Sequence, residues 1–342
     1  MIRIGVIGFG YWGPNLVRNA AETPGARVTR VADLSAARLD AAAARHPGVR
    51  TTRDPGELID AADVDAVLVA TPVSTHFDLA LRALRAGKHV LVEKPLASTA
   101  GQAARLIEEA AARDLVLMVD HTFVYHGAVR KIREIVKGGG LGDVLYFDST
   151  RVNLGIFQRD VNVLWDLAVH DLSILDCLVD DRPVAVSATG MSHVAGGAEN
   201  IAYLTLFFET ARIAHIHVNW LAPVKVRRTL IGGSRKMVVY DDLEPSEKVK
   251  VYDKGITVED NPDDVYKLLI GYRSGDMWAP AFDTTEALRT EMAHFVACVA
   301  DGGRPETDGE AGLRVIRVLE AASRSLLRRG GAVELRTGVY SG

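Results

Sequence analysis

The sequence predicts a two-domain α/β chain: a parallel, doubly wound sheet comes first, and an α+β domain with a large, mostly antiparallel open sheet follows. Two observations support this fold class. Up to Asp120, short aliphatic runs alternate with amphipathic helical segments, as in a parallel sheet covered on both faces. After Gly142, strand-like segments follow one another through short polar turns. Several of them alternate apolar and polar residues, which is typical of antiparallel sheets.

The elements of the first half are predicted in alternating order. Ser35 is placed to cap a helix, and Gly87 to end one. The expected strands are residues 2–7, 28–32, 66–70, 89–92 and 115–119. The expected helices are residues 11–22, 35–45, 57–61, 77–86 and 100–113.

The second half is predicted to hold most of its strands in succession. They are residues 144–153, 184–192, 201–208, 213–220, 226–231, 237–240 and 249–252, with helices over 164–178, 284–300 and 310–328. A helix expected over 124–136 joins the halves. We therefore divide the chain into a first domain of residues 1–122 and a second of residues 123–342.

Composition is that of a globular protein, with 342 residues, 48% of them hydrophobic, and a net charge of −4. The absence of a basic cluster argues against a nucleic-acid partner. The amino-terminal segment does not have the pattern of a signal peptide, and no apolar run reaches the length of a membrane span. Cys177 and Cys298 fit no zinc spacing, so we expect a reduced, cytoplasmic chain without a metal.

A glycine-rich turn follows the first expected strand and opens a helix. Its glycines are Gly8, Gly10 and Gly13, in the spacing G-x-G-x-x-G. Such a turn lets backbone approach a pyrophosphate, and the helix amino terminus favours its negative charge. Asp33, at the end of the second expected strand, is suited to bind the ribose hydroxyls and to repel a 2′-phosphate. The first domain is therefore predicted to be a Rossmann domain that binds NAD, with NADP less favoured.

Other residues are expected near the coenzyme because ligands bind beyond the carboxyl ends of parallel strands. Tyr11 and Trp12 belong to the glycine-rich turn, and Thr71 and Pro72 follow the strand beside it. His76 either contacts the coenzyme or stabilises the start of its own helix.

The stretch VLVEKPLAS places Glu93, Lys94 and Pro95 at the end of another expected core strand. A solvated turn would explain most lysines. At this edge, however, Lys94 is expected beside the nicotinamide, where it can exchange a proton with a substrate hydroxyl as hydride leaves the same carbon. Glu93 is expected to bind coenzyme or to moderate the charge of Lys94. The position makes Lys94 a candidate catalytic residue.

The segment WDLAVHD supplies a second candidate pair. Asp166 and His170 are four residues apart and share a face if the segment is helical. A histidine oriented by a carboxylate can act as a general acid or base near neutral pH. The alternative is an ordinary ion pair on a helix surface.

Together, GFGYWG, Asp33, ATPVSTH, VEKPLA and WDLAVHD resemble the glucose–fructose oxidoreductase/inositol dehydrogenase/rhizopine-catabolism family, Gfo/Idh/MocA. The resemblance covers essentially the whole chain. It implies NAD(P)-dependent oxidation or reduction at a carbinol carbon of a sugar or cyclitol. It also implies that Lys94 is catalytic, with Asp166 and His170 as the helix-borne pair, and that the Lys94–Pro95 bond is cis. Homodimers or homotetramers are expected through the second-domain sheet.

A finer resemblance is to enzymes that oxidise the 3-hydroxyl of nucleotide-linked sugars. Residues 11–15, in GYWGPN, and residues 151–155, in RVNLG, carry it. An inositol, aminocyclitol or free-sugar dehydrogenase is an alternative. Another is an enzyme whose tightly bound NAD oxidises the substrate and then reduces it again, so that the net reaction is an elimination or an epimerisation. The alternative of another class is a regulator that senses NAD without turnover.

Three further residues are candidate substrate ligands. Arg151 and Asn153 alternate with apolar neighbours on the first strand of the second domain, and they face either the substrate or a partner subunit. Tyr125 lies where the chain crosses between the domains.

Overall fold

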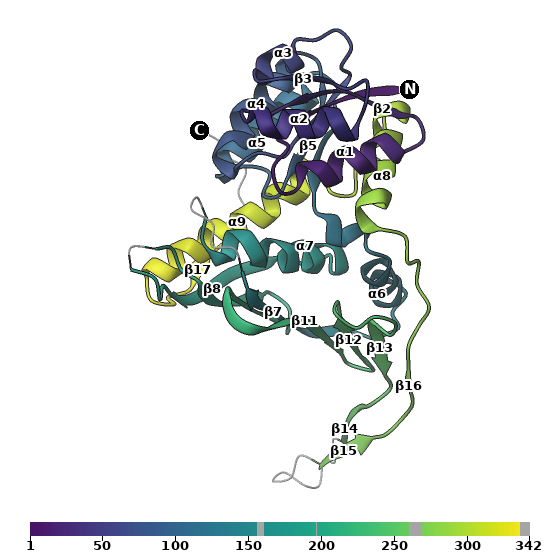
Figure 1. Ribbon diagram of the computed structural model, residues 1–342. Coiled ribbons are helices and arrows are strands. Elements are labelled where there is room, and N and C mark those ends of the chain that lie inside the picture. The colour runs from purple at the N-terminus through teal and green to yellow at the C-terminus, as the bar shows by residue number, and fades with distance from the viewer. Residues whose placement is uncertain (156–160, 196, 260–268, 336–342) are drawn as a thin grey trace. The chain divides into compact units, whose positions relative to one another are not determined.

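The computed structural model describes residues 1–155, 161–195, 197–259 and 269–335 (Figure 1). The described chain divides into two compact units. Unit 1 comprises Met1–His126 with Thr285–Glu320, and unit 2 comprises Gly127–Thr284 with Ala321–Gly342. The chain therefore returns to unit 1 after leaving it. The division expected from the sequence, with one boundary after residue 122, assigns the segment Thr285–Glu320 to the second domain, whereas the structure groups that segment with unit 1.

Unit 1 is built on a parallel sheet. Within its described residues the strand order is β3-β2-β1-β4-β5-β6. The chain order reverses between β1 and β4, and such a switch point is where ligands bind to doubly wound sheets. Every residue of β4 is buried, as expected for a strand covered on both faces. The strands are β1 (Ile2–Ile7), β2 (Ala26–Ala32), β3 (Arg50–Thr52), β4 (Ala66–Val69), β5 (His89–Glu93) and β6 (Leu117–Asp120).

Helices connect these strands. Side chains cap α3 and α5: Asp54 accepts a hydrogen bond from the Gly56 N–H, and Thr99 accepts one from the Gln102 N–H. The helices of unit 1 are α1 (Gly13–Glu22), α2 (Ala36–Arg45), α3 (Pro55–Ile59), α4 (Val73–Arg85), α5 (Ala100–Ala111), η1 (Thr122–Tyr125), α8 (Ala287–Asp301) and the first part of α9 (Gly309–Leu327).

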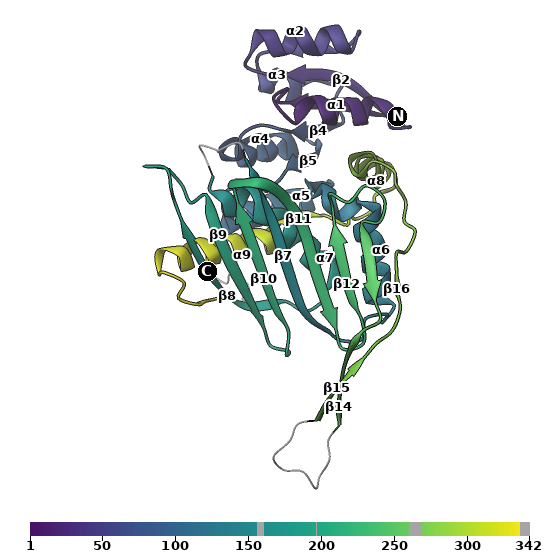
Figure 2. The ribbon, with the colours of Figure 1, turned by 60° about the horizontal axis from the view of Figure 1, so that its bottom comes forward.

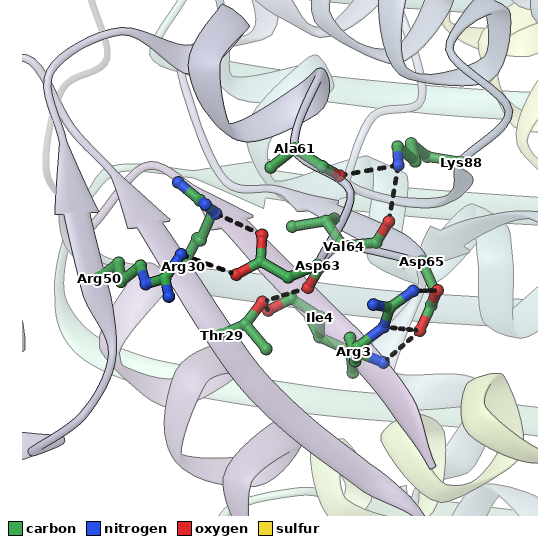
Figure 3. Close-up of polar contacts among 10 residues, drawn as sticks. All are labelled: Arg3, Ile4, Thr29, Arg30, Arg50, Ala61, Asp63, Val64, Asp65 and Lys88. Carbon is green, nitrogen blue, oxygen red and sulfur yellow. Dashed lines mark hydrogen bonds and ion pairs between the residues drawn. The ribbon is translucent and has the colours of Figure 1, made fainter.

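The loop before β4, at the amino edge of the unit 1 sheet, is joined to neighbouring strands by ion pairs (Figure 3). Arg3, on β1, binds the Asp65 carboxylate with its side chain and its backbone N–H. Arg30 and Arg50 bind Asp63 from β2 and β3. Lys88 donates to two backbone carbonyls of the loop before β4. This edge is therefore closed by structural contacts, and the functional candidates lie at the opposite, carboxyl edge.

Unit 2 contains a large mixed sheet. Its described strands follow the order β16-β13-β12-β11-β7-β10-β9-β8-β17, and only the β7–β10 pair is parallel. A two-stranded hairpin of β14 and β15 lies beyond it. The strands are β7 (Val144–Leu154), β8 (Pro183–Met191), β9 (Ile201–Phe208), β10 (Ile213–Asn219), β11 (Leu221–Gly233), β12 (Met237–Asp241), β13 (Val249–Tyr252), β14 (Gly255–Glu259), β15 (Leu269–Arg273), β16 (Met277–Trp278) and β17 (Val333–Glu334).

Helices cover one face of this sheet, including α6 (Gly127–Lys137) and α7 (Val169–Leu178). Figure 2 looks onto the opposite face, which no helix among the described residues covers. Burial therefore alternates along the strands: on β9, Ala202, Leu204 and Leu206 are buried, and Tyr203 and Phe207 are exposed.

The segment before α7 is a π-helix, η2 (Leu164–Ala168). The sequence predicts one continuous helix over 164–178. The structure instead divides this segment into a π turn and α7. Single π turns inside helices are frequent at functional sites.

The predicted fold class, an α/β chain with a parallel sheet and a mostly antiparallel second sheet, is confirmed. No helix in the described ranges has both the length and the apolar character needed to cross a membrane.

Candidate active site

The glycine-rich turn after β1 depends on close backbone contacts. Gly8 has φ +98°, in the left-handed region, and a Cβ there would lie 2.3 Å from the Ala70 carbonyl oxygen. A Cβ on Gly13 would lie 2.1 Å from the Gly8 carbonyl oxygen. On Gly10 a Cβ would meet no atom closer than the Arg38 guanidinium, at 3.6 Å. Two glycines thus close the turn, and the third leaves space in front of it.

The turn leads into α1, whose amino terminus has no capping side chain and no acidic residue in its first turn. The positive end of its dipole favours an anion. The open space at Gly10 and this helix end fit the pyrophosphate of a dinucleotide. NAD, when bound, supplies the nicotinamide carbon that exchanges hydride with a substrate.

Asp33 follows β2 and is held by backbone. Its Oδ2 accepts from the Phe9 N–H at 2.7 Å, and its Oδ1 accepts from the Ser35 N–H at 2.8 Å. Arg38 lies 3.5 Å from Oδ2 with its side chain 57% exposed. The carboxylate is therefore fixed beside the glycine-rich turn, where the predicted contact with the adenosine ribose requires it.

The side chains of the turn differ in their surroundings. Tyr11 is 85% exposed. Trp12 is half-buried, and its indole N–H donates to Asp120 Oδ2 at 2.8 Å, across the carboxyl edge of the sheet. Asp120 ends β6 and is 1% exposed. Coenzyme contact by Tyr11 and Trp12 stays a prediction, and Asp120 is a partner that the sequence did not suggest.

Thr71 and Pro72 follow β4, next to the turn after β1. His76, on α4, is 1% exposed, and its two ring nitrogens each lie 2.8 Å from a backbone carbonyl, those of Pro95 and Thr71. His76 therefore links the loop after β4 to the loop after β5. That linkage favours the supporting role considered for it, and its contact with the coenzyme stays a prediction.

Lys94 directly follows β5 at the same carboxyl edge. It is half-buried, as is Glu93, which pairs in register with Asp120 of β6. The Lys94–Pro95 bond is cis, as the family resemblance implies. Pro95, Leu96 and Ala97 are buried, so the backbone after the lysine is held by packing.

In unit 2, η2 and α7 carry the second candidate pair. Asp166 lies on η2, and its Oδ2 accepts from the Trp220 indole N–H at 3.0 Å. Trp220 is 1% exposed and follows β10. His170 lies on α7, where Ser173 donates to its backbone carbonyl. The proposed orientation of His170 by Asp166 stays a prediction.

Arg151 of β7 is 3% exposed and binds Asp171 of α7. Its Nε lies 2.8 Å from Oδ2, and a second nitrogen lies 3.1 Å from Oδ1. Ser149 also donates to Asp171. Burial alone would lower the pKa of Arg151, but the charge and hydrogen bonds of Asp171 raise it overall. The pair thus fixes α7 to the sheet.

The remaining substrate candidates have different environments. Asn153 is half-buried on β7. Tyr125 is 1% exposed in unit 1, and its hydroxyl lies 3.0 Å from Thr307 Oγ1. Burial, and then the charge of Glu291, raise the pKa of Tyr125 well above its usual value. These contacts describe a packing role for Tyr125, and substrate binding by Tyr125, Arg151 and Asn153 stays a prediction.

No group of three or more histidine, cysteine or acidic residues in the described part of the chain is arranged to hold a metal ion. His215 and His217 share the uncovered sheet face, where His217 stacks on Tyr203 with ring centroids 4.4 Å apart.

Comparisons with known proteins agree with this geometry. Residues 2–121 match the family described as "Oxidoreductase family, NAD-binding Rossmann fold", and residues 129–239 match the "GFO/IDH/MocA C-terminal domain". Inositol 2-dehydrogenase 2 of Paenarthrobacter aurescens is 30% identical, over 95% of this chain and 96% of its own length.

UDP-N-acetylglucosamine 3-dehydrogenase of Acidithiobacillus ferrooxidans is also 30% identical, over 92% of this chain and 94% of its own length. A solved structure of the enzyme of that name from the same organism superposes with a TM-score of 0.78. It is 26% identical and covers 96% of this chain and 98% of the solved chain. The chain therefore belongs to the GFO/IDH/MocA family of oxidoreductases and has that family's NAD-binding Rossmann domain.

Proposed function

We propose that the protein is an NAD-dependent dehydrogenase or reductase of a sugar-like substrate, and that it acts on the 3-hydroxyl of a nucleotide sugar. The observation that carries the chemistry is the position of Lys94. It follows β5 at the carboxyl edge of the sheet. The neighbouring strand is β4, which leads to Thr71, and β4 in turn lies beside β1, which leads into the glycine-rich turn. An amine at this edge is suited to exchange a proton with a carbinol whose carbon exchanges hydride with NAD.

Lys94 and His170 together handle the hydroxyl proton and its hydrogen bonds in this proposal. A charged amine or imidazole stabilises the negative charge that develops on the oxygen. Asp166 limits the orientations of His170, and Trp220 in turn fixes Asp166. Which of the two groups takes the proton is a question for kinetics on variants of each.

The nucleotide-sugar assignment is supported by the similarity to UDP-N-acetylglucosamine 3-dehydrogenase over nearly the full length of both chains. The GYWGPN and RVNLG stretches point the same way. An inositol dehydrogenase is the second candidate, because the similarity to inositol 2-dehydrogenase 2 is equal in identity and equally complete.

An NAD-linked absorbance screen over UDP-N-acetylglucosamine, its uronate, sugar phosphates, free sugars and inositols separates these candidates. We expect NADH formation with a nucleotide sugar, and a product with a carbonyl at carbon 3 by NMR. Deuterium at carbon 3 of the substrate should be transferred to the nicotinamide. Turnover of an inositol alone would replace this assignment by the second candidate. Substrate conversion without free NADH would indicate a reaction with no net oxidation.

We also propose that copies of the chain assemble through the uncovered face of the unit 2 sheet. Three large side chains on adjacent strands are partly exposed there: Tyr203, Phe207 and Ile213. Light scattering of the purified protein should give a dimer or tetramer. Phe207→Glu should shift it toward the monomer, whereas a monomeric wild type would contradict the proposal.

A further inference from the structure

Two buried carboxyl groups are neighbours in unit 1, and one of them binds the glycine-rich turn through Trp12. Asp120 ends β6, and Glu291 projects from α8 on a segment far along the chain. Asp120 is 1% exposed and Glu291 is 0% exposed. Asp120 pairs in register with Glu93, the residue before Lys94. The two carboxyl groups therefore lie at the carboxyl edge of the parallel sheet, where the coenzyme is expected to bind.

The hydrogen bonds of Asp120 are those of an ionised acceptor. Trp12 donates its indole N–H to Oδ2 at 2.8 Å, and Thr122 donates its hydroxyl to Oδ1. Thr122 has one hydroxyl proton, and geometry assigns it to Asp120.

Glu291 has a different environment. Neither of its carboxyl oxygens accepts a hydrogen bond from a donor in the described part of the chain that meets the geometric requirements. Its acidic neighbour is Asp120, and the hydroxyl of Thr122 lies beside both carboxyl groups. Two ionised carboxylates side by side would repel each other, and an ionised carboxylate that is fully buried without a donor is costly, so Glu291 carries a proton. Burial, and then the charge of Asp120, raise the pKa of Glu291 well above its usual range.

We propose that Glu291 is a neutral carboxylic acid that donates its proton to Asp120 and thereby acts as a positioning residue for Trp12 in the coenzyme-binding turn. The proton stays on Glu291, and no bond is made or broken during turnover. The O–H···O⁻ bond holds the Asp120 carboxylate in one orientation. The carboxylate in that orientation aligns the indole of Trp12. The remaining ionisable neighbours are Glu93 on β5 and Tyr125 on η1, and the Tyr125 hydroxyl is bound to Thr307.

This arrangement predicts opposite outcomes for two substitutions. Glutamine at position 291 keeps a donor for Asp120, whereas leucine fills a similar volume and donates nothing. Glu291→Gln should therefore leave the Kd for NADH within about twofold, and Glu291→Leu should raise it about tenfold, the size of one charge-assisted hydrogen bond. A purely packing role would make leucine the better tolerated change. The inference rests on coenzyme binding by unit 1 and not on the identity of the substrate.

The direct test is infrared spectroscopy of the intact protein at neutral pH. The difference between wild type and Glu291→Gln should contain the carbonyl band of a protonated carboxylic acid, without any need for turnover. Absence of that band would overturn the proposal, as would wild-type NADH affinity in a folded Glu291→Leu protein. Trp12→Phe should weaken NADH binding similarly. The double variant Trp12→Phe/Glu291→Leu should bind NADH little more weakly than either single variant, because both changes disrupt the same linked contact. Failure of every sugar in the absorbance screen would leave these results unchanged.

Discussion

The Trp220 indole N–H donates a 3.0 Å hydrogen bond to the Asp166 carboxylate, and so joins the residue after β10 to the π turn that precedes α7. Trp220 is 1% exposed, so the bond is shielded from water. Asp166 lies one turn before His170. A buried indole therefore sets the position of the carboxylate that is proposed to orient His170, the candidate acid–base residue.

Trp220→Phe should lower kcat by about tenfold, because a hydrogen bond to a charged group contributes roughly 1.5–3 kcal/mol. The Kd for NADH should stay unchanged, since Trp220 belongs to unit 2. Trp165→Phe is the matched control: that indole donates to Ser323 rather than to Asp166, at 3.0 Å. Equal losses in the two variants, measured by steady-state kinetics on the substrate found in the screen, would contradict this role.

The glycines of the first turn should separate folding from coenzyme binding. Gly13→Ala places a methyl group 2.1 Å from the Gly8 carbonyl oxygen, so it should destabilise the protein by roughly 1–3 kcal/mol. Gly10→Ala meets only Arg38, at 3.6 Å, so it should fold normally and lose NADH affinity. Urea unfolding and NADH titration measure the two effects. Normal NADH affinity in Gly10→Ala would show that the pyrophosphate binds elsewhere.

Asp33→Ser should reduce the preference for NADH over NADPH. The substitution removes a carboxylate that would repel a 2′-phosphate, and it leaves Arg38, whose side chain is 57% exposed. We expect NADH to bind about tenfold more weakly, the effect of losing charged hydrogen bonds to the ribose. NADPH should bind more tightly, and Arg38→Ala in the Asp33→Ser background should reverse that gain. Fluorescence titration with both coenzymes would contradict the prediction if their affinity ratio did not change.

Asp242 should contribute to stability at neutral pH but not in acid. Burial alone would raise its pKa, but the hydrogen bond and charge of Arg227, 3.2 Å away, with the charges of Arg151 and Lys248, hold it below the usual value. A carboxylate with a depressed pKa stabilises the fold above its unfolded value, about 3.9, and this stabilisation is lost as pH falls through the folded pKa.

Asp242→Asn should therefore lower the free energy of unfolding at pH 7 by about 1–2 kcal/mol. Urea unfolding at a series of pH values should show the difference from wild type shrinking below about pH 4. The exposed Asp78→Asn is the control and should change little. A difference that is constant with pH would mean that the ion pair is not its cause.

Much of the framework could be predicted because the relevant signals are local. Strand β9 has the predicted bounds. Its residues alternately face the helices and the open side of the sheet, and this period of two marks the strand in the sequence. The glycine spacing and Asp33 identify the nucleotide-binding turn for the same reason: each depends on backbone within a few residues. The sequence predicts a continuous helix over 164–178, because apolar spacing over one turn does not separate a π-helix from an α-helix.

The contacts missed from the sequence are those between distant segments. Trp220 and Asp166 are 54 positions apart, and Trp12 and Asp120 are 108 apart. No periodic pattern connects such residues. Arg151 illustrates a related difficulty: alternation along β7 gives two faces, but only the placement of α7 shows that Asp171 occupies the side toward which Arg151 points.

The central claim is that Lys94 acts on the substrate hydroxyl next to a bound NAD. Stopped-flow measurement of NADH formation in a single turnover, with saturating NAD and substrate, tests it most directly. We expect Lys94→Ala to slow this step by about 10²–10⁴-fold, the usual contribution of an acid–base group, while the Kd for NADH changes little. Hydride transfer at the wild-type rate in Lys94→Ala would contradict the account.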